Sequence, residues 1–279
     1  MEKTMKRKGL TGFQLKYIAM FLMVLDHIHY FFEFTGKIPI WFSMLGRLSA
    51  PLFLFCIIEG FTHTHNRKKY FTQIYSIAVV MGLIQFFIIQ LGLTRPDGFY
   101  PQNQMLATFS ILLIILQGFD WCSKKQWVKG LPAIIVPIML PFLAFFIGSR
   151  VPGAWNFINL LSLSILPLHS FIMDGGTFFI LQGILMYLFR KNRKWQAIVF
   201  VISTIVIDVV LPLALMSGIT IELLLTVAFE WMGAFAAILM LMYNGERGAG
   251  NKKLFYWFYP GHVYILFGLS FLLYLILNK

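Results

Sequence analysis

The stretch WQAIVFVISTIVIDVVLPLALM, residues 195–216, identifies the fold class, because it is almost entirely apolar and Asp208 is its only charged residue. As a helix rising about 1.5 Å per residue, it is long enough to cross about 30 Å of hydrocarbon. The runs lack the alternation of a membrane β-barrel, so we expect an all-α, polytopic membrane protein. Similar runs cover residues 13–34, 45–62, 71–92, 104–119, 128–148, 171–189, 221–243 and 256–277.

The composition excludes an ordinary soluble domain. Hydrophobic residues make up 59% of the 279 residues and charged residues only 12%, against about 45–50% and 25% in soluble domains. The two cysteines stand apart, Cys56 in an apolar run and Cys122 in a basic loop. We therefore expect free thiols, with neither a disulfide framework nor a cysteine metal site.

The formal charge of +12 predicts orientation better than it predicts nucleic acid binding, since Lys and Arg gather in the cytoplasmic loops of membrane proteins. With nine spans and a cytoplasmic N-terminus, the basic clusters 67–69, 124–129, 190–194 and 247–253 all face the cytoplasm. Segment 155–169 is short and polar, which favours a partial re-entrant or interfacial piece. A tenth span there would move two of these clusters outside; nine to ten spans remain the expectation.

The chain shows no internal repeat and no low-complexity tract, so we expect a single integral-membrane domain over residues 1–279. Its basic start, Lys3, Lys6, Arg7 and Lys8, leads into a first apolar run that is too long for a signal peptide. These features predict a multi-pass protein of the cell inner (cytoplasmic) membrane. The lipid bilayer is then its surroundings, and no nucleic acid partner is expected.

Ionisable residues inside apolar spans are the candidates for chemistry, because each costs about 2.5–3.5 kcal/mol at a helix centre. Lys16 and His27 are eleven residues apart and share one face of the first span. His27 is the first candidate for a base, with Asp26 beside it. The alternatives are an interfacial anchor for Lys16 and a buried polar link between helices for the Asp26-His27 pair. Asp208 and Glu230 receive no role from the sequence.

The second span carries Arg47 at its outer end and the pair Glu59 and His63 at its inner end, on one helix face. A carboxylate beside an imidazole raises its basicity, as proton transfer requires. The basic segment that follows contains Arg67 and Lys68, which either record topology or bind phosphate. His63 and His65 are two positions apart in this segment, and no third metal ligand is near them in the sequence. They would form a poor zinc site, so we expect no metal.

Two motifs near the C-terminal end face the cytoplasm in this topology. In YNGERG, residues 243–248, Asn244 and Arg247 can hold a phosphate or a carboxylate next to flexible glycines. FYWFYPGH, residues 255–262, includes Tyr259 and His262 and either stacks on a purine or forms an interfacial aromatic belt, the more usual role. The sequence lacks a P-loop, a nucleophile elbow and a dinucleotide fingerprint, so ATP hydrolysis, lipase chemistry and dinucleotide binding lack support.

At these residues the sequence resembles the TraX family, nearly end to end and with the motifs in order. The YNG-x-RG and FYP-x-H boxes are the most specific of them. The other shared positions are Leu10-Thr-Gly12, Leu15-Lys16, Asp26-His27, Gly46-Arg47, Pro51, Glu59-Gly60-Phe61, Tyr70, Asn103, Thr108 and Asp174-Gly175.

This resemblance implies a pilin N-acetyltransferase of conjugative pili, similar to the acyltransferase-three type of membrane enzymes that use cytosolic acyl-CoA. That wider group has a basic residue about ten positions before a histidine in its first span. Lys16 and His27 stand in this relation, with Lys where Arg is commoner, which weakens any bidentate role there. We therefore expect an acetyl-CoA-dependent acetyltransferase whose acceptor is a peptide N-terminus, a sugar or a small metabolite.

In the expected mechanism His27 is the general base, Asp26 or Glu59 orients an imidazole, and Arg47 or Lys16 stabilises the oxyanion. A direct transfer is favoured over an acetyl-enzyme. The alternatives are a proton-coupled transporter of a small solute and a membrane assembly partner. The remaining expected contacts are Arg67, Lys68, Asn244, Arg247, Tyr259 and His262 for acetyl-CoA, and His63, Asn103 and Asp174 for the acceptor.

Overall fold

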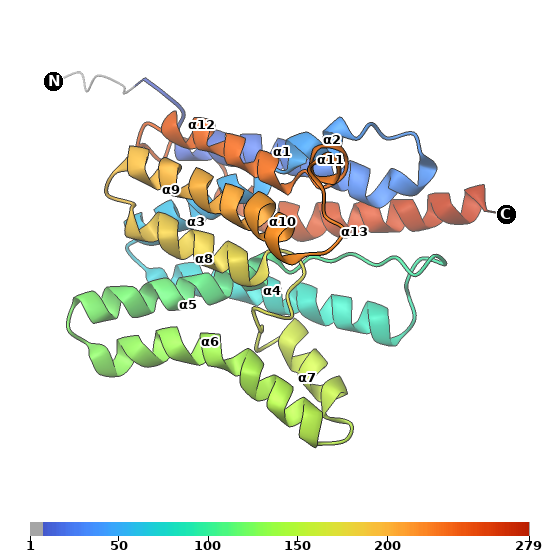
Figure 1. The fold of residues 1–279 in the computed structure, drawn as a ribbon, viewed down its shortest axis with the longest axis horizontal. Coiled ribbons are helices and arrows are strands. Elements are labelled where there is room, and N and C mark those ends of the chain that lie inside the picture. Colours follow the sequence, from blue (N-terminus) through green and yellow to red (C-terminus); the bar gives the residue numbers. More distant parts are fainter. Residues whose placement is uncertain (1–7, 279) are drawn as a thin grey trace. The chain divides into compact units, whose positions relative to one another are not determined.

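The computed structural model describes residues 8–278, and within that range the chain is built of helices without a β-strand (Figure 1). The basic start at Lys3, Lys6 and Arg7 lies outside the described residues. The chain divides into two compact units, each made of segments distant in sequence. The first unit is Met1–Gly60 with Leu185–Lys252, and the second is Phe61–Ile184 with Lys253–Lys279.

The first unit is built around α1 (Gly12–Phe32), which begins at a capping box between Thr11 and Gln14. The short helix α2 packs beside α1, and α9 continues through a π-helical turn into α10. The unit's further elements are η1 (Glu33–Thr35), α2 (Trp41–Gly46), α3 (Ser49–His63), α9 (Arg193–Ile205), η2 (Val206–Val210), α10 (Leu211–Leu215), α11 (Ile221–Thr226), η3 (Glu230–Phe235) and α12 (Ala236–Leu241).

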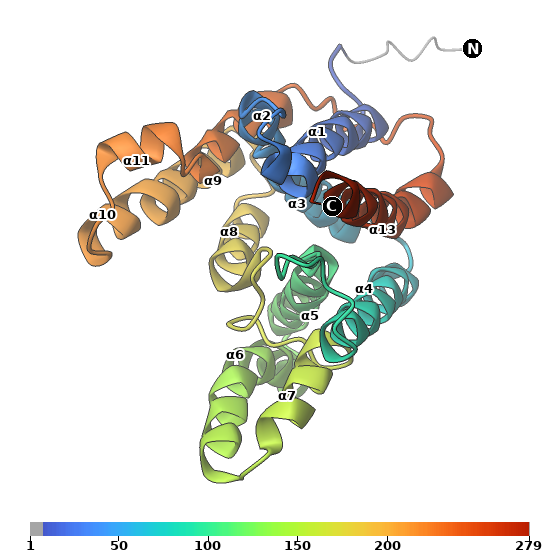
Figure 2. The same cartoon turned by 90° about the vertical axis from the view of Figure 1, so that its right-hand side faces the viewer.

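In the second unit α5 (Met105–Ser123) and α6 (Trp127–Arg150) lie side by side in both views (Figure 2). Gly82 in α4 (Arg67–Gln90) allows a close approach to α7 (Ala154–Leu163), since a Cβ there would lie 1.5 Å from the Leu163 carbonyl oxygen. The remaining helices are α8 (Gly176–Leu188), which begins here and ends in the first unit, and α13 (Lys252–Leu277).

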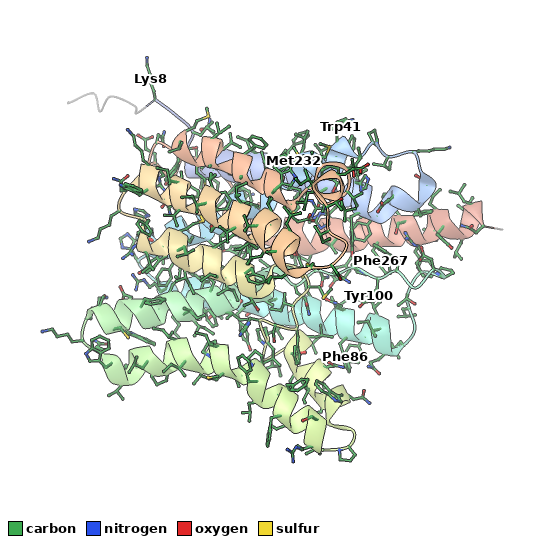
Figure 3. The ribbon with its side chains drawn as sticks, viewed as in Figure 1. Lys8, Trp41, Phe86, Tyr100, Met232 and Phe267 are labelled. Atoms are coloured by element: carbon green, nitrogen blue, oxygen red, sulfur yellow. The ribbon has the colours of Figure 1, made fainter. Side chains whose placement is uncertain are left out.

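Seven helical segments in residues 8–278 are long and apolar enough to cross a membrane, which confirms the all-α polytopic class. Large apolar side chains cover their outer surfaces, as contact with lipid requires (Figure 3). The seven are Gly12–Thr35, Trp41–His63, Arg67–Gln90, Met105–Ser123, Trp127–Arg150, Arg193–Leu215 and Lys253–Leu277.

The count of nine to ten spans is not confirmed, because two expected spans are shorter helices, Gly176–Leu188 and Glu230–Leu241. The run 171–189 becomes helical only at Gly176, since the Thr108 hydroxyl donates to the Asp174 carbonyl and accepts from the Gly176 amide. The Asp174 carboxylate in turn accepts from the Met105 amide of α5. The run 221–243 breaks after α11, which leaves Glu230 at the start of a new turn. Segment 155–169 holds only α7, ten residues long, in keeping with a partial segment.

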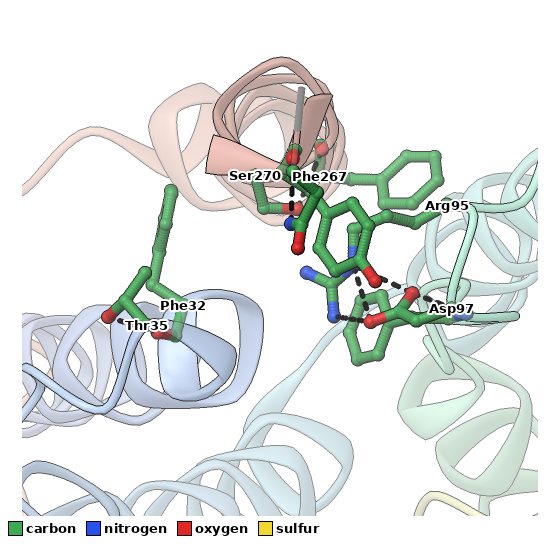
Figure 4. A network of polar contacts seen from close by, with 9 residues as sticks. Phe32, Thr35, Arg95, Asp97, Phe267 and Ser270 are labelled. Carbon is green, nitrogen blue, oxygen red and sulfur yellow. Dashed lines mark hydrogen bonds and ion pairs between the residues drawn. The ribbon is translucent and has the colours of Figure 1, made fainter. Parts of the chain in front are cut away.

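An arginine-centred cluster closes one end of the second unit (Figure 4). Arg95 is only 4% exposed and donates hydrogen bonds to both carboxylate oxygens of Asp97, at 2.8–3.0 Å. Its guanidinium also stacks on Phe99, 4.3 Å from the ring centroid, and on Tyr274, at 5.2 Å. These hydrogen bonds hold the pKa of Asp97 below its ordinary value. The cluster ties the connection after α4 to the last turns of α13.

Candidate functional site: buried polar clusters in each unit

Arg47 is the centre of a polar cluster in the first unit. One Nη atom lies 2.8 Å from the Ser43 hydroxyl and 3.7 Å from Asp26 of α1, and the other lies 3.5 Å from Glu230. Its Nε is buried and has no acceptor among the described residues. The structure therefore brings together two expected site residues, Arg47 and Asp26, and adds Glu230, which had no role predicted from the sequence.

Gly46 explains how Arg47 reaches Asp26. A Cβ at position 46 would lie 2.2 Å from the Asp26 Cβ and 2.6 Å from its Oδ1, so any side chain would separate α2 from α1. Ser49, the first residue of α3, also donates a hydrogen bond of 2.7 Å to the Ala19 carbonyl of α1. Gly46 and Arg47 thus act together. Gly46 permits the close approach of α2 to α1, and this approach lets Arg47 reach Asp26.

His27 lies within electrostatic range of Arg47 and inside an aromatic environment. Its ring centroid is 6.2 Å from that of Tyr30 and 6.0 Å from that of Phe31. Nδ1 is 2.8 Å from the carbonyl oxygen of Met23, and because a carbonyl only accepts, Nδ1 carries the proton. In the neutral ring the lone pair is then on Nε2, the atom that a general base requires.

Glu59 has a partner that sequence analysis missed. Its carboxylate lies 3.1 Å from Nη1 of Arg193 in α9, and the same guanidinium bonds Gln196. The guanidinium also stacks on Phe55, at 4.5 Å, and on Tyr243, at 5.0 Å. The only available signal was general, since a buried carboxylate in a span needs a basic partner, and several arginines qualified.

Tyr243 belongs to this cluster and borders the expected ligand motif. Burial, reinforced by the nearby charge of Glu59, raises the pKa of Tyr243 to about 12. Lys16 of α1 acts electrostatically on Cys56 in α3, and its ammonium lies 5.8 Å from the Phe13 ring. Of these basic side chains, Arg193 is thus paired with a carboxylate, and Lys16 lies beside an aromatic ring.

The segment 242–248 wraps around the start of α1. The Leu10 amide donates to the Met242 carbonyl, and the Leu10 carbonyl accepts from the Asn244 amide. The amides of Gly12 and Phe13 donate to the carbonyls of residues 246 and 247. The Asn244 side chain accepts from the Glu246 amide. Arg247 is exposed, stacks 5.3 Å from the Phe13 ring and forms no ion pair with a carboxylate in the described part of the chain. The motif fixes the helix start and presents an arginine, and its ligand role remains a prediction.

In the second unit Arg67 has structural partners. Its Nη1 is 2.8 Å from Asp120 and 3.3 Å from Gln117, both in α5, and its guanidinium stacks 4.3 Å from the Phe61 ring. Asp120 also pairs with Lys124 at 2.8 Å. A phosphate would compete with Asp120 for Arg67. The expected neighbours Lys68 and His63 are exposed.

Four positions of the family motifs meet inside the second unit. Asp174 accepts a hydrogen bond from the Met105 amide, at 3.2 Å, and one from the Tyr259 hydroxyl, and its own carbonyl accepts from Thr108. Asn103, which is buried, donates to the hydroxyl of Tyr264 at 2.9 Å. The resemblance grouped these residues only by role, whereas the structure shows contacts that join α5, α13 and the connection before α8.

His262 follows the same pattern as His27. Its Nδ1 lies 2.7 Å from the Phe258 carbonyl oxygen, so Nδ1 donates, and the ring stacks on Phe258 at 4.6 Å. It belongs to the second unit, and His27 belongs to the first. Of the expected site residues, the first unit holds Lys16, Asp26, His27, Arg47, Glu59, Asn244 and Arg247, and the second holds His63, Arg67, Lys68, Asn103, Asp174, Tyr259 and His262.

Apolar helices that enclose ion pairs and oriented histidines define this chain as a polytopic membrane protein with polar sites inside its helical units. In residues 8–278 no three His, Cys, Asp or Glu side chains are grouped so as to hold a metal ion. The chain belongs to the TraX protein family, whose sequence profile matches residues 11–270.

One relative is a bacterial protein whose name refers to fimbrial assembly. The chain is 26% identical over 271 residues to the probable fimbrial assembly protein FimC, serogroup H1, of Dichelobacter nodosus, and the alignment covers 92% of this chain and 94% of the relative. No solved structure matches the chain significantly. The resemblance to TraX is therefore confirmed, and the wider relation to acyltransferase-three enzymes stays a prediction.

Proposed function

We propose that this protein is a membrane acetyltransferase of pilus assembly, which transfers an acetyl group from acetyl-CoA to an acceptor amine, such as a peptide N-terminus, or to a hydroxyl. The family and the fimbrial assembly relative support the biological setting. The observation that carries the chemistry is the orientation of His27. Its Nδ1–H donates a hydrogen bond to the Met23 carbonyl oxygen, and the next residue along the helix, Asp26, pairs with Arg47.

In the proposed reaction, Nε2 of His27 takes the proton from the acceptor nitrogen or oxygen as that atom attacks the thioester carbonyl. The new N–C or O–C bond forms, the C–S bond breaks, and the proton passes from His27 to the departing thiolate of CoA. Arg47 has a buried Nε donor to offer a developing oxyanion, and Asp26 holds the guanidinium in place. Proton transfer by a placed histidine contributes about 10²–10⁴-fold to rate.

The length of α1 suits a long donor. Lys16 and His27 are eleven residues apart on one helix face, which corresponds to about 16 Å along the axis. The pantetheine arm of CoA is long enough to bridge such a distance between its phosphates and its thioester. Phosphates near Lys16 and Arg247, with the thioester at His27, satisfy both ends within the first unit.

We place the N-terminus and this basic end in the cytoplasm of a cell with an inner membrane, because acetyl-CoA is cytosolic and the basic loops favour that side. Arg247 is the better phosphate ligand in this arrangement, since Arg67 is already paired with Asp120.

The test is acetyl-CoA binding by calorimetry and acetyl-CoA hydrolysis by thiol release, with purified full-length protein in nanodiscs. His27→Asn keeps a donor for the Met23 carbonyl and removes the basic nitrogen. We expect it to lower turnover about 10²-fold or more and to leave binding intact. Arg247→Ala should weaken binding about tenfold. Arg150→Ala, which removes another exposed arginine stacked on a phenylalanine, should change neither.

Two results would overturn the proposal. An active His27→Asn enzyme would remove the base, and wild-type protein that binds no acyl-CoA would remove the donor. Solute flux into proteoliposomes without acetyl-CoA would then favour the proton-coupled transporter.

A further inference from the structure

The second unit contains a cavity of about 530 Å³ that plays no part in the proposed acetyl transfer. It lies among the last turns of α4, the connection 91–104, the end of α6, and α7 with the segment that follows it. None of the site residues expected from the sequence lines it. Phe86 and Tyr100, two of its lining residues, are labelled in Figure 3. Its volume is in the range of about 300–1,000 Å³ typical of small-molecule sites.

The polar part of the wall consists mainly of side-chain carboxamides. No Asp, Glu, Lys, Arg or His side chain lines the cavity within the described range. A charged ligand would therefore lose its hydration without gaining a counter-charge, which is costly. Each carboxamide offers an acceptor oxygen and two donor hydrogens, a set suited to an uncharged partner that both donates and accepts. The five are Gln85, Gln90, Gln102, Gln104 and Asn159.

Gln85 lines the cavity and carries an unsatisfied polar atom that is turned away from it. The residue is 4% exposed, and its Oε1 is buried without a donor anywhere in residues 8–278. Buried polar atoms are normally hydrogen-bonded, so an unsatisfied one calls for a ligand or a water. The terminal torsion of glutamine is broad, which lets the carboxamide turn toward a donor in the cavity.

Aromatic rings also line the cavity. Trp155 contacts Phe145, with ring centroids 6.2 Å apart, and Phe171, at 6.3 Å. Phe86 and Tyr100 are the other aromatic lining residues. A lining that combines flat apolar faces with planar amides suits a ligand that has an apolar C–H face and a polar edge of hydroxyl groups.

We infer that this cavity binds a neutral saccharide. Neighbouring hydroxyls of a sugar ring each donate and accept, and so pair with carboxamides along one edge while the ring face lies on Trp155 or Phe145. An extended peptide fits less well, because its successive N–H and C=O groups point in alternating directions and only half of them face one wall.

The cavity lies at the end of the second unit where α4 ends and α5 begins, whereas Arg67 and Lys124 mark the opposite end. In the orientation predicted from the basic loops, a sugar therefore reaches it from the non-cytoplasmic side. The site does not depend on the acetyl-CoA chemistry of the first unit, so either proposal can fail without the other.

The experiment is ligand-observed saturation-transfer NMR on the full chain in nanodiscs free of glycoside detergent, since a maltoside headgroup would compete. The probes are maltose and N,N′-diacetylchitobiose, with the blocked dipeptide N-acetyl-Ala-Ala-amide as the peptide probe. We expect saturable binding of at least one disaccharide. Gln85→Leu should weaken it about tenfold, because a ligand hydroxyl loses its acceptor. Gln126→Leu, the same change on an exposed residue outside the cavity, should leave affinity unchanged.

Gln85→Leu replaces a buried amide by an apolar group of similar shape and should fold. If it does not, Asn159→Leu on the open side of the cavity supplies the same test. Absence of disaccharide binding to folded wild type would overturn the inference. Binding of the dipeptide alone, lost in Gln85→Leu, would also overturn it and assign the cavity to a peptide.

Discussion

Replacing Gly46 with alanine should destabilise the protein by forcing α1 and α2 apart. The new Cβ would lie 2.2 Å from the Asp26 Cβ. A flexible side-chain tip would turn away, but a Cβ is fixed by its own backbone. One of the two helices must therefore shift, and the Arg47–Asp26 contact, already 3.7 Å long, must lengthen.

The magnitude follows from two opposing effects. Overpacking by one methyl group costs about 1–3 kcal/mol. Alanine is favoured over glycine inside a helix by about 0.5–1 kcal/mol. A control removes the second effect: Gly268 in α13 has no atom within 4 Å of its would-be Cβ, so Gly268→Ala gains helix propensity without a clash. The difference between the two variants should therefore be about 1–3 kcal/mol.

The assay is the free energy of unfolding in mixed micelles, measured for wild type, Gly46→Ala and Gly268→Ala under one set of conditions. We expect Gly268→Ala to be as stable as wild type or more stable, and Gly46→Ala to be less stable than both. If Gly46→Ala proves as stable as Gly268→Ala, the close approach of α1 and α2 at Asp26 is refuted, together with the role of Gly46 in placing Arg47.

Two further predictions concern ion pairs. Glu59→Gln leaves the Arg193 guanidinium without its carboxylate, and we expect a loss of about 3 kcal/mol in unfolding free energy, the lower end for broken buried pairs; adding Arg193→Met should recover part of it, and a further loss would contradict the pairing. Because Arg95 lowers the pKa of Asp97 in the folded state, the pair stabilises the fold above the ordinary aspartate pKa of about 4 and stops doing so as pH falls toward the lower folded value. Unfolding measured from pH 6 to pH 3 should show this loss in wild type, and Asp97→Asn should show a smaller one.

Several residues of the candidate site stand out in an apolar sequence by their chemistry. His27 and Asp26 are ionisable groups inside a predicted span, and Arg47 is at the end of another, so each needs a partner or a purpose. In the structure Asp26 pairs with Arg47, and a hydrogen bond to a backbone carbonyl defines the tautomer of His27. The partner of Glu59 was not predictable, because helical spacing suggested His63 while the contact is with Arg193, 134 residues away.

The spans show the same division. Long apolar runs predicted helices, but the run 221–243 is broken between α11 and η3, and the run 171–189 begins its helix late. Hydropathy is averaged over a window, so it does not register a break that lets Glu230 reach Arg47 or Asp174 bond the Met105 amide. The break in one run and the late helix start in the other thus accompany local polar contacts.

The all-helical membrane class follows from the amino-acid sequence alone. The long apolar runs indicate segments that lie in hydrocarbon, and a backbone in hydrocarbon must satisfy its hydrogen bonds within the segment. Which polar groups meet depends instead on the packing of the helices. Contacts such as Glu59 with Arg193 and Asn103 with Tyr264 join residues 134 and 161 positions apart. Such contacts depend on how helices pack, on the glycines that let them approach and on the cavities they leave, and none of these is a property of a single segment.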